Sequence, residues 1–393
     1  MNILAVCTLP PHRGGSAVSS ALLVRGFAAA GHTVRVLSPI ADDEAAGPDA
    51  FAAAHPDIAV TRYRVPFAEV APNLPGAGEY RRVERERIGA LLPALIAQDR
   101  PDLLFMGRET FAWDVPEIAR RHEIPVVLRT AGSMTIGMLH GTLPEADVRY
   151  LIEQYRKADL IICPARHLAA RMEPFGLGRV RVIWNAVDAT HFAPRAKDPA
   201  LLRSLGLRPD EVVAAHVSNL KSLKRPLDVV EAAAVALRRD PRLAFVIVGQ
   251  GPAGAAMQAA CAAKGIADRF RFEGWVDHDR VADFINLADV VVMPAEDETQ
   301  ARVYLETQAC GRVLLASDIA AAREVIRDGE TGVLFRKGEP ADLADRLLHL
   351  ADQPALRAAI GERARARIAA HTLPSIVAEY LDALAAVAAA GRG

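Results

Sequence analysis

Residues 289–317, which read DVVVMPAEDETQARVYLETQACGRVLLAS, predict the fold of the chain. Val290–Met293 has the length and β-branched content of a buried strand, and Pro294 ends it. An acidic loop, a short helix at 302–310 and a second apolar strand follow. A strand–loop–helix–strand unit of this kind belongs to a parallel sheet. Its loop lies at the carboxyl end of the strands, where such sheets bind ligands.

Two glutamates frame that loop, Glu298 before the helix and Glu306 about one turn inside it. If the helix starts near Ala301, its unpaired N–H groups and its dipole favour an anion at that end. Carboxylates accept hydrogen bonds from hydroxyls, and an anion with hydroxyls beside it describes a sugar nucleotide. On spacing alone, two solvated carboxylates explain the pair equally well.

The segment resembles the E-x7-E signature of retaining family 4 glycosyltransferases with the GT-B fold. The residues that match the signature and its surroundings are Pro294, Glu298, Glu306, Ala309, Cys310 and Gly311. The resemblance implies that Glu298 contacts hydroxyls of the donor sugar and that Glu306 holds the nucleotide ribose.

The sequence departs from this family directly after the first glutamate. The usual glycine-rich EGFG is replaced by Glu298-Thr299-Gln300-Ala301. We expect Thr299, Gln300, Ala301 and Arg302 to contact the donor. The substitution changes the side chains against the donor sugar, so the identity of that sugar stays open.

The composition predicts two globular domains. A chain of 393 residues is long for one domain, and its 51% of apolar residues suffice for two cores. A formal net charge of −1 argues against a nucleic-acid partner. The cysteines form no C-x-x-C pair, which favours buried thiols in a reducing compartment over a zinc ribbon or a disulfide scaffold. They are Cys7, Cys163, Cys261 and Cys310.

The N-terminus predicts a strand and not a secretory signal, because Met1 and Asn2 run directly into the apolar residues 3–6. No apolar run approaches ~20 residues, so no membrane-spanning segment is expected. The expected location is the cytoplasm. A peripheral contact with the inner face of the membrane stays open.

The first strand is followed by a loop with Gly14-Gly15 and a helix whose expected N-cap is Ser16. A glycine pair at such a turn lets the backbone approach a phosphate, although a purely structural turn is the simpler explanation. The resemblance implies that Gly14 and Gly15 face the donor phosphates and sugar.

The family often carries a histidine just after the strand Val126–Arg129, facing the reacting sugar. Ala131 or one of its neighbours stands at that place here. The nearest histidine is His140, which either folds back into the site or is an ordinary loop residue.

Other parts of the first half are less informative. Residues 41–56 are expected to form a poorly ordered excursion, and 66–78 a proline-rich loop. A helix at 79–98 has a strongly charged first half, 81–87. That charge predicts a solvated face with i,i+4 ion pairs; a surface for an acceptor or an anionic lipid is the alternative.

The domain boundary is expected near 186–200. Asn185-Ala186-Val187-Asp188, followed by Phe192, resembles the segment that marks the crossover between the two domains of the family. We therefore predict an N-terminal domain at 1–186 and a C-terminal domain at 187–373. A final helix at 374–393 is expected to pack back on the N-terminal domain.

The loop after the strand Val212–Val217 is cationic, and Pro226 opens the helix that follows it. Cations beside a helix N-terminus at a strand end make an anion site, although surface cations also explain them. The family has Gly-Arg here and a lysine five residues later, both on the donor pyrophosphate. Lys224 matches the lysine. Asn219 replaces the arginine, so Lys221 or Arg225 is expected to supply the missing charge. A similar Ser-Asn loop occurs in a subgroup that transfers N-acetylglucosamine to malate.

The loop at 273–276 resembles the family's loop whose backbone reads the nucleotide base, which makes Val276 a candidate contact. Asp277-His278-Asp279 resembles the D-x-D metal motif of the other glycosyltransferase fold. Because a helix follows directly, we interpret Asp277 as its N-cap and expect no metal and no cofactor.

The predicted fold is α/β, GT-B, with two Rossmann-like domains facing each other across a cleft; a single eight-fold barrel is disfavoured by the mid-chain linker. The expected function is a retaining glycosyltransferase that uses a nucleotide-sugar donor, a UDP-sugar, and a small-molecule, lipid-linked or glycan acceptor. Lys224 and the helix start near Arg302 would stabilise the departing pyrophosphate, and Glu298 would orient the sugar. The alternatives are a sugar-nucleotide epimerase of the same fold and a non-catalytic donor-binding remnant.

Overall fold

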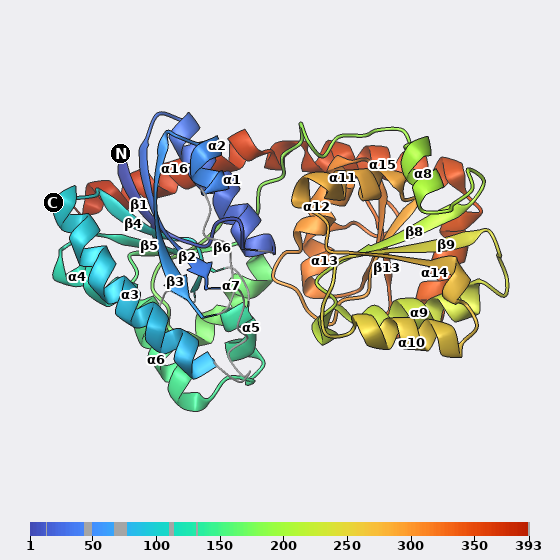
Figure 1. The fold of residues 1–393 in the computed structure, drawn as a ribbon, viewed down its shortest axis with the longest axis horizontal. Helices are drawn as coiled ribbons and strands as arrows, with labels where there is room; N and C mark the ends of the chain where they lie inside the picture. Colours follow the sequence, from blue (N-terminus) through green and yellow to red (C-terminus); the bar gives the residue numbers. More distant parts are fainter. Residues whose placement is uncertain (13, 43–48, 67–76, 110–113, 131–132, 392–393) are drawn as a thin grey trace. The chain divides into compact units, whose positions relative to one another are not determined.

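A computed structural model describes the chain at residues 1–12, 14–42, 49–66, 77–109, 114–130 and 133–391 (Figure 1). The chain forms two compact units. The first comprises Met1–Ala186 together with Leu373–Gly393, and the second comprises Val187–Thr372. Each unit is built around a parallel sheet of its own, with helices between successive strands, so the predicted α/β class is confirmed.

In the described part of the first unit, seven parallel strands pair in the order β3-β2-β1-β4-β5-β6-β7. They are β1 (Asn2–Val6), β2 (Thr33–Ala41), β3 (Ile58–Val65), β4 (Leu103–Met106), β5 (Val126–Arg129), β6 (Leu160–Cys163) and β7 (Val180–Val182). The helices of this unit are α1 (Gly15–Ala29), α2 (Ala50–Ala54), α3 (Ala77–Gln98), α4 (Val115–Arg121), α5 (Ser133–Leu139), α6 (Glu145–Arg156), α7 (Arg166–Met172) and α16 (Leu373–Ala390).

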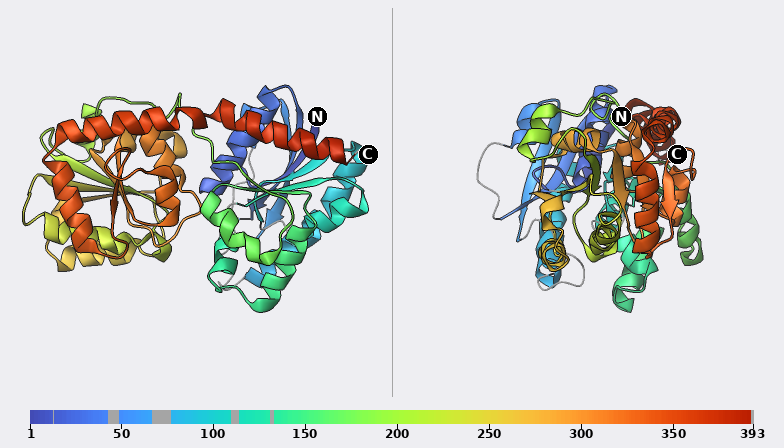
Figure 2. Two further views of the ribbon diagram at one scale, coloured as in Figure 1. Left: turned by 180° about the vertical axis from the view of Figure 1, so that it is seen from behind. Right: turned by 90° about the vertical axis from the view of Figure 1, so that its right-hand side faces the viewer.

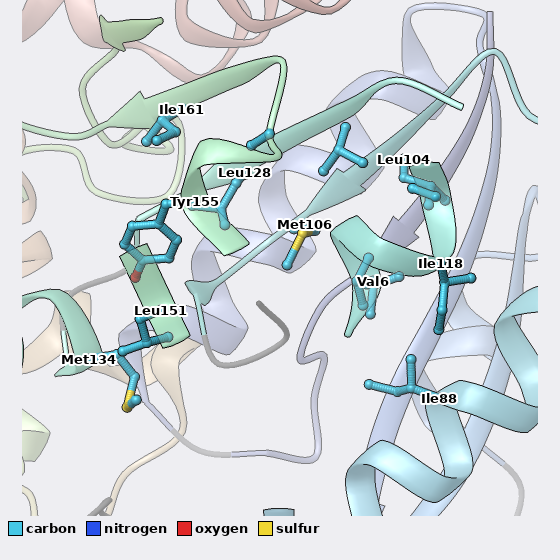
Figure 3. Packing of buried hydrophobic residues seen from close by; sticks show 14 of the residues in the cluster. Val6, Ile88, Leu104, Met106, Ile118, Leu128, Met134, Leu151, Tyr155 and Ile161 are labelled. Carbon is cyan, nitrogen blue, oxygen red and sulfur yellow. The ribbon is translucent and has the colours of Figure 1, made fainter. Parts of the chain in front are cut away.

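Successive residues of a strand point to opposite faces of the sheet, and this alternation builds two cores in the first unit. Val6 and Met106 pack with α3, α4 and α6, where Figure 3 shows Ile88, Ile118 and Tyr155 around them. Their neighbours on the same strands pack on the other face with α1 and α16.

The helix α16 covers the first sheet beside α1 (Figure 2). Its Tyr380 is buried, with its ring 6.2 Å from that of Phe27 and 6.1 Å from that of Phe105. By length and composition alone, α16 is apolar enough to cross a membrane, so the expectation that no such run exists was wrong on that criterion. The apolar residues that raise its hydropathy include those that fill the core of this unit.

In the described part of the second unit, six parallel strands pair in the order β10-β9-β8-β11-β12-β13. They are β8 (Val212–Val217), β9 (Leu243–Val248), β10 (Phe270–Gly274), β11 (Val290–Met293), β12 (Val313–Ser317) and β13 (Val333–Phe335). The helices are α8 (Pro199–Ser204), α9 (Pro226–Ala236), α10 (Gly254–Ala263), α11 (His278–Leu287), α12 (Arg302–Ala309), α13 (Ala320–Val325), α14 (Pro340–Ala351) and α15 (Pro354–Ile368). Figure 1 shows α9 and α10 on one face of this sheet and α11 and α12 on the other.

Some local predictions were wrong. The helix α1 begins at Gly15 with Gly14 as its N-cap, so Ser16 lies inside the helix. The expected excursion at 41–56 contains the short helix α2, because the Asp49 side chain caps it by accepting from Ala52 N at 3.1 Å. Residues 43–48 of that excursion, and 67–76 of the predicted proline-rich loop, lie outside the described residues.

The four cysteines are buried free thiols, as the sequence predicted.

Candidate functional site

The site residues predicted in the second half lie in loops after β8, β10 and β11 and at the start of α12. In a parallel sheet, the carboxyl ends of all strands share one edge. The fold therefore brings these loops to one edge of the second sheet. A backbone hydrogen bond joins two of them, because Glu296 N donates to Leu223 O at 2.8 Å.

Lys224 and Glu298 form an ion pair with each other, across two loops that are far apart in sequence. Lys224 ends the 3₁₀ helix Ser222–Lys224, and Glu298 follows β11. The Glu298 side chain is 8% exposed and that of Lys224 is 20% exposed. The two residues predicted to act on the leaving group and the sugar are thus in contact, and each neutralises the other's charge.

Glu306 makes a second ion-paired cluster at the start of α12. Its Oε1 lies 2.9 Å from His278 Nε2 and 3.1 Å from Arg302 Nη2. The carboxylate is buried, which by itself raises its pKa, but Arg302 and His278 hold the pKa below its usual range. Both contacts use Oε1, so Oε2 can accept a hydrogen bond from a ligand hydroxyl.

His278 was not predicted as a partner of Glu306. The sequence offered it only as the centre of a D-x-D pattern, whereas the structure places it in the first position of α11 with Asp277 as the N-cap residue. The Asp277 side chain makes no capping hydrogen bond. The His278 ring also packs against that of Phe192, with the ring centres 5.1 Å apart.

The expectation that Lys221 or Arg225 supplies a missing charge stays a prediction. The Arg225 guanidinium donates to Asp228 at 2.7 Å and to Glu296 at 3.0 Å, so these carboxylates balance its charge. Lys221 directly precedes the 3₁₀ helix and is exposed. Asn219 has a side-chain oxygen, Oδ1, that is buried and has no hydrogen-bond partner among the residues that the structure describes.

Two glycines after β9 lie against the loop that carries Asn219. A Cβ on Gly249 would lie 1.8 Å from Ser218 O, and one on Gly251 would lie 1.9 Å from Asn219 O. Only glycine permits this approach of two backbones. The G-x-G-P pattern at 249–252 was the signal for it.

The remaining predicted donor contacts lie as follows. Thr299, Gln300 and Ala301 connect Glu298 to α12, and Ala301 occupies the N-cap position of that helix. Val276 lies in the loop between β10 and α11 and is partly exposed.

The predicted residues of the first half belong to the other unit. Gly14, at the N-cap of α1, has φ of 107°, which requires a glycine, and Gly15 is the first residue of the helix. His140 is exposed just after α5. Ala131, at the place of the family's histidine, lies outside the described residues.

The charged segment 81–87 makes an i,i+4 ion pair of the predicted kind, between Arg82 and Glu86 at 2.8 Å. Arg81 and Arg85 pair instead with residues far along the chain, Asp147 at 2.8 Å and Asp114 at 2.6 Å. Glu84 differs from this pattern. It is buried and accepts a hydrogen bond from the Tyr63 hydroxyl at 3.2 Å. Burial raises its pKa to about 7.

In the described residues, no group of three or more histidine, cysteine, aspartate or glutamate side chains could hold a metal ion.

Known families match nearly the whole chain. Residues 13–191 match the family described as "Glycosyltransferase Family 4", and residues 198–367 match "Glycosyl transferases group 1". A curated D-inositol 3-phosphate glycosyltransferase of Frankia alni is 31% identical over 82% of this chain and 88% of that protein. The chain belongs to the family 4 glycosyltransferases, which have the GT-B fold. The family predicted from Glu298 and Glu306 is therefore confirmed.

Other family 4 relatives are longer than this chain. A D-inositol 3-phosphate glycosyltransferase of Nocardia farcinica is 33% identical over 69% of this chain. The chain spans about three fifths of the length of the first curated relatives that it matches, and 62% in the Nocardia case.

Solved structures share the fold of this family 4 chain. Sucrose-phosphate synthase of Thermosynechococcus elongatus superposes with a TM-score of 0.84 at 18% identity, covering 99% of this chain and all of that one. HepE of Anabaena, solved in complex with UDP and glucose, superposes with a TM-score of 0.78 at 18% identity, covering 98% and 100%.

Proposed function

We propose that this family 4 chain transfers a sugar from a nucleotide-activated donor, a UDP-sugar, to a hydroxyl of an acceptor, with retention of the anomeric configuration. The carboxyl edge of the second sheet binds the donor, and the first unit binds the acceptor. Complexes of HepE with UDP support the choice of nucleotide. The curated relatives, named as glycosyltransferases, support the reaction class.

The observation that carries this proposal is the different pairing of the two glutamates of the E-x7-E signature. Glu298 pairs with the flexible side chain of Lys224, and Glu306 pairs with Arg302 and His278. A lysine ammonium can exchange a carboxylate for a pyrophosphate, because both are anions. Glu306 keeps Oε2 for the ribose hydroxyls while Oε1 stays paired.

The reaction breaks the bond between the anomeric carbon of the sugar and the pyrophosphate oxygen. Negative charge grows on that oxygen, and two groups stabilise it: the Lys224 ammonium, and the N–H groups at the start of α12 with the positive end of the helix dipole. When Lys224 turns to the pyrophosphate, Glu298 accepts hydrogen bonds from the sugar hydroxyls. The acceptor hydroxyl attacks the same face and passes its proton to the leaving group.

A donor-binding remnant is the second candidate, and it has specific support. Asn219 stands where the family has an arginine, and Arg225 is neutralised by Asp228 and Glu296. One cation fewer on the pyrophosphate would weaken catalysis more than binding. The two candidates differ in turnover, since a remnant binds the donor and leaves its glycosidic bond intact.

A thermal-shift screen of UDP, GDP and ADP, followed by their sugars, tests the proposal. A bound nucleotide raises the melting temperature by mass action, so UDP at about 100 times its Kd should stabilise the chain by about 2.7 kcal/mol. If no nucleoside diphosphate shifts the melting temperature at millimolar concentration, the sugar-nucleotide function is wrong.

Turnover then separates enzyme from remnant. Because the relatives are named for D-inositol 3-phosphate, this compound and malate head a panel of acceptors that also includes lipid-linked sugars and glycans. Release of UDP that depends on one acceptor supports the transferase.

A cytoplasmic location with peripheral membrane contact is part of the proposal, and fractionation of cells that express the chain tests it.

A further inference from the structure

His216 is a fully buried histidine on β8 that the mechanism above does not use. Its Nδ1 lies 2.9 Å from the carbonyl oxygen of Val292 on the adjacent strand β11, and its Nε2 lies 2.8 Å from Ser218 Oγ. A carbonyl oxygen can only accept, so Nδ1 carries the ring proton. In the neutral ring Nε2 is therefore the acceptor, and the Ser218 hydroxyl donates to it.

The direction of these hydrogen bonds is constant at neutral pH. Burial lowers the pKa of His216 to about 4, and the nearby charge of Lys224 also lowers it, against the hydrogen bond to Val292 that raises it. A neutral ring has one donor and one acceptor, and both are used here.

Because the Ser218 hydroxyl donates its hydrogen bond to His216, its oxygen can accept one from the backbone. Leu220 N–H donates to Ser218 Oγ at 3.1 Å and closes a tight turn around Asn219. The turn needs this support, because Leu220 has φ of +42°, a conformation that residues with a side chain rarely adopt.

The same turn is also held by the end of β9 and the loop that follows it. Ser218 N donates to Val248 O at 3.0 Å, and Ala253 N donates to Leu220 O at 3.0 Å. Gly249 and Gly251 let the two backbones meet. The turn is thus fixed between His216 and the neighbouring loop, and it leads directly into the 3₁₀ helix that ends at Lys224.

We propose that His216 is a positioning residue for the nucleotide diphosphate. Through Ser218 it holds the turn at 218–220, and thereby Asn219 and Lys224, in the geometry that binds the pyrophosphate. His216 itself touches no substrate. The inference rests on the proposed function, because it requires that Lys224 meets the donor pyrophosphate.

Calorimetric titration of UDP into four variants tests this role. Ser218→Ala and His216→Phe each remove the hydrogen bond between these two side chains and should weaken UDP binding by about tenfold. The double variant should bind UDP no more weakly than His216→Phe, because both changes remove the same hydrogen bond. His216→Gln keeps a donor and an acceptor and should recover part of the affinity.

The matched control is Ser20→Ala. Ser20 is a fully buried serine inside α1 of the first unit, so it undergoes the same chemical change outside the edge of the second sheet proposed to bind the donor. It should bind UDP as the wild type does. A purely structural role for His216 would lower the melting temperature of the variants and leave their UDP affinity unchanged.

The outcomes separate the inference from the function on which it rests. If the wild type binds UDP and Ser218→Ala binds it equally well, the positioning role is wrong and the function stands. Additive losses in the double variant also contradict it. If the wild type binds no nucleoside diphosphate, the proposed function itself fails. Should His216→Phe not fold, the comparison of Ser218→Ala with Ser20→Ala decides.

Discussion

At the scale of single residues, the two signature glutamates have different partners, and this difference predicts different phenotypes. Glu306→Gln removes the charge that Arg302 and His278 compensate and weakens the acceptor proposed for the ribose. We expect UDP binding to weaken by about 1.5–3 kcal/mol, the range for a hydrogen bond to a charged group. Calorimetry with UDP alone measures this loss, because ribose is present in UDP and in the full donor.

Glu298→Gln provides the comparison for Glu306→Gln. It releases Lys224 from its ion pair, so UDP affinity should stay unchanged or increase, while the initial rate of transfer falls by about tenfold to a hundredfold. Equal losses of UDP affinity in the two variants would contradict the assignment of ribose to one carboxylate and sugar to the other.

A third residue, Glu84, predicts a pH dependence of stability in the first unit. Its folded pKa, about 7, lies above the value of 4.5 for an unperturbed glutamate. The folded chain therefore holds this proton more tightly than the unfolded chain does. The resulting stabilisation is fully present below pH 4.5 and is lost as the pH rises from there through 7.

Glu84→Gln removes this titration and keeps an acceptor for the Tyr63 hydroxyl. Urea denaturation at pH 5 and pH 8 should show that the wild type loses more stability between these pH values than the variant does, by about 1–3 kcal/mol. An identical pH dependence in both proteins would show that Glu84 does not titrate in this range.

The predictability of the site also differs from residue to residue. Glu298, Glu306 and Lys224 were found from the sequence because their spacing is a local pattern of the family. Their pairings were not, since His278 precedes Glu306 by 28 positions and Lys224 precedes Glu298 by 74. His216 lay in an apolar strand with no pattern around it, so only its two hydrogen bonds reveal it.

At the scale of elements, the structure depends on close contacts between helix backbones. Gly361 in α15 faces the end of α12, where a Cβ would lie 2.0 Å from the carbonyl oxygen of Gly311. Gly361→Ala must push the two helices apart, and we expect a loss of about 1–3 kcal/mol of stability. Because α12 carries Glu306, UDP affinity should fall as well.

The control for Gly361→Ala is Gly89→Ala in α3, where an added Cβ meets nothing within 4 Å. That substitution should stabilise the chain by about 0.5–1 kcal/mol, because alanine favours a helix more than glycine does. Thermal unfolding of both variants checks the pair. A tolerated Gly361→Ala would mean that α15 can move away from α12 at little cost.

The continuous apolar strands were predicted more accurately than the strand that alternates between polar and apolar residues. Val212–Val217 and Val290–Met293 are continuous apolar runs with clear ends, and their bounds were predicted without error. The strand β3 was missed because it alternates between polar and apolar residues beside an alanine-rich segment. Its pairing with β2, which the sequence could not show, stabilises it there.

At the scale of the whole molecule, each unit has its own core, and damage to one core should stay within its unit. Tyr380→Ala removes the ring that packs on Phe27 and Phe105 and should cost about 3–5 kcal/mol. Hydrogen exchange should then accelerate in β1, α1 and β4, with no change in β8 or β11.

Leu347→Ala in α14, a buried residue of the second core, should produce the reverse pattern. If either substitution accelerates exchange in both sheets equally, the two units unfold as one cooperative body.

The ends of the second unit lie side by side, since Val187 N donates to His371 O at 3.2 Å and Val187 forms a bridge with Thr372. The second unit is one continuous segment, Val187–Thr372. The first unit also includes α16, which follows that segment in the chain. During translation, residues 187–372 emerge before α16. At about 5–20 residues per second, the first unit waits roughly ten to forty seconds between the synthesis of β7 and that of Tyr380. The half that is synthesised first is completed last, and in that interval α16 does not yet cover the apolar residues of β1, α1 and β4 that pack against it.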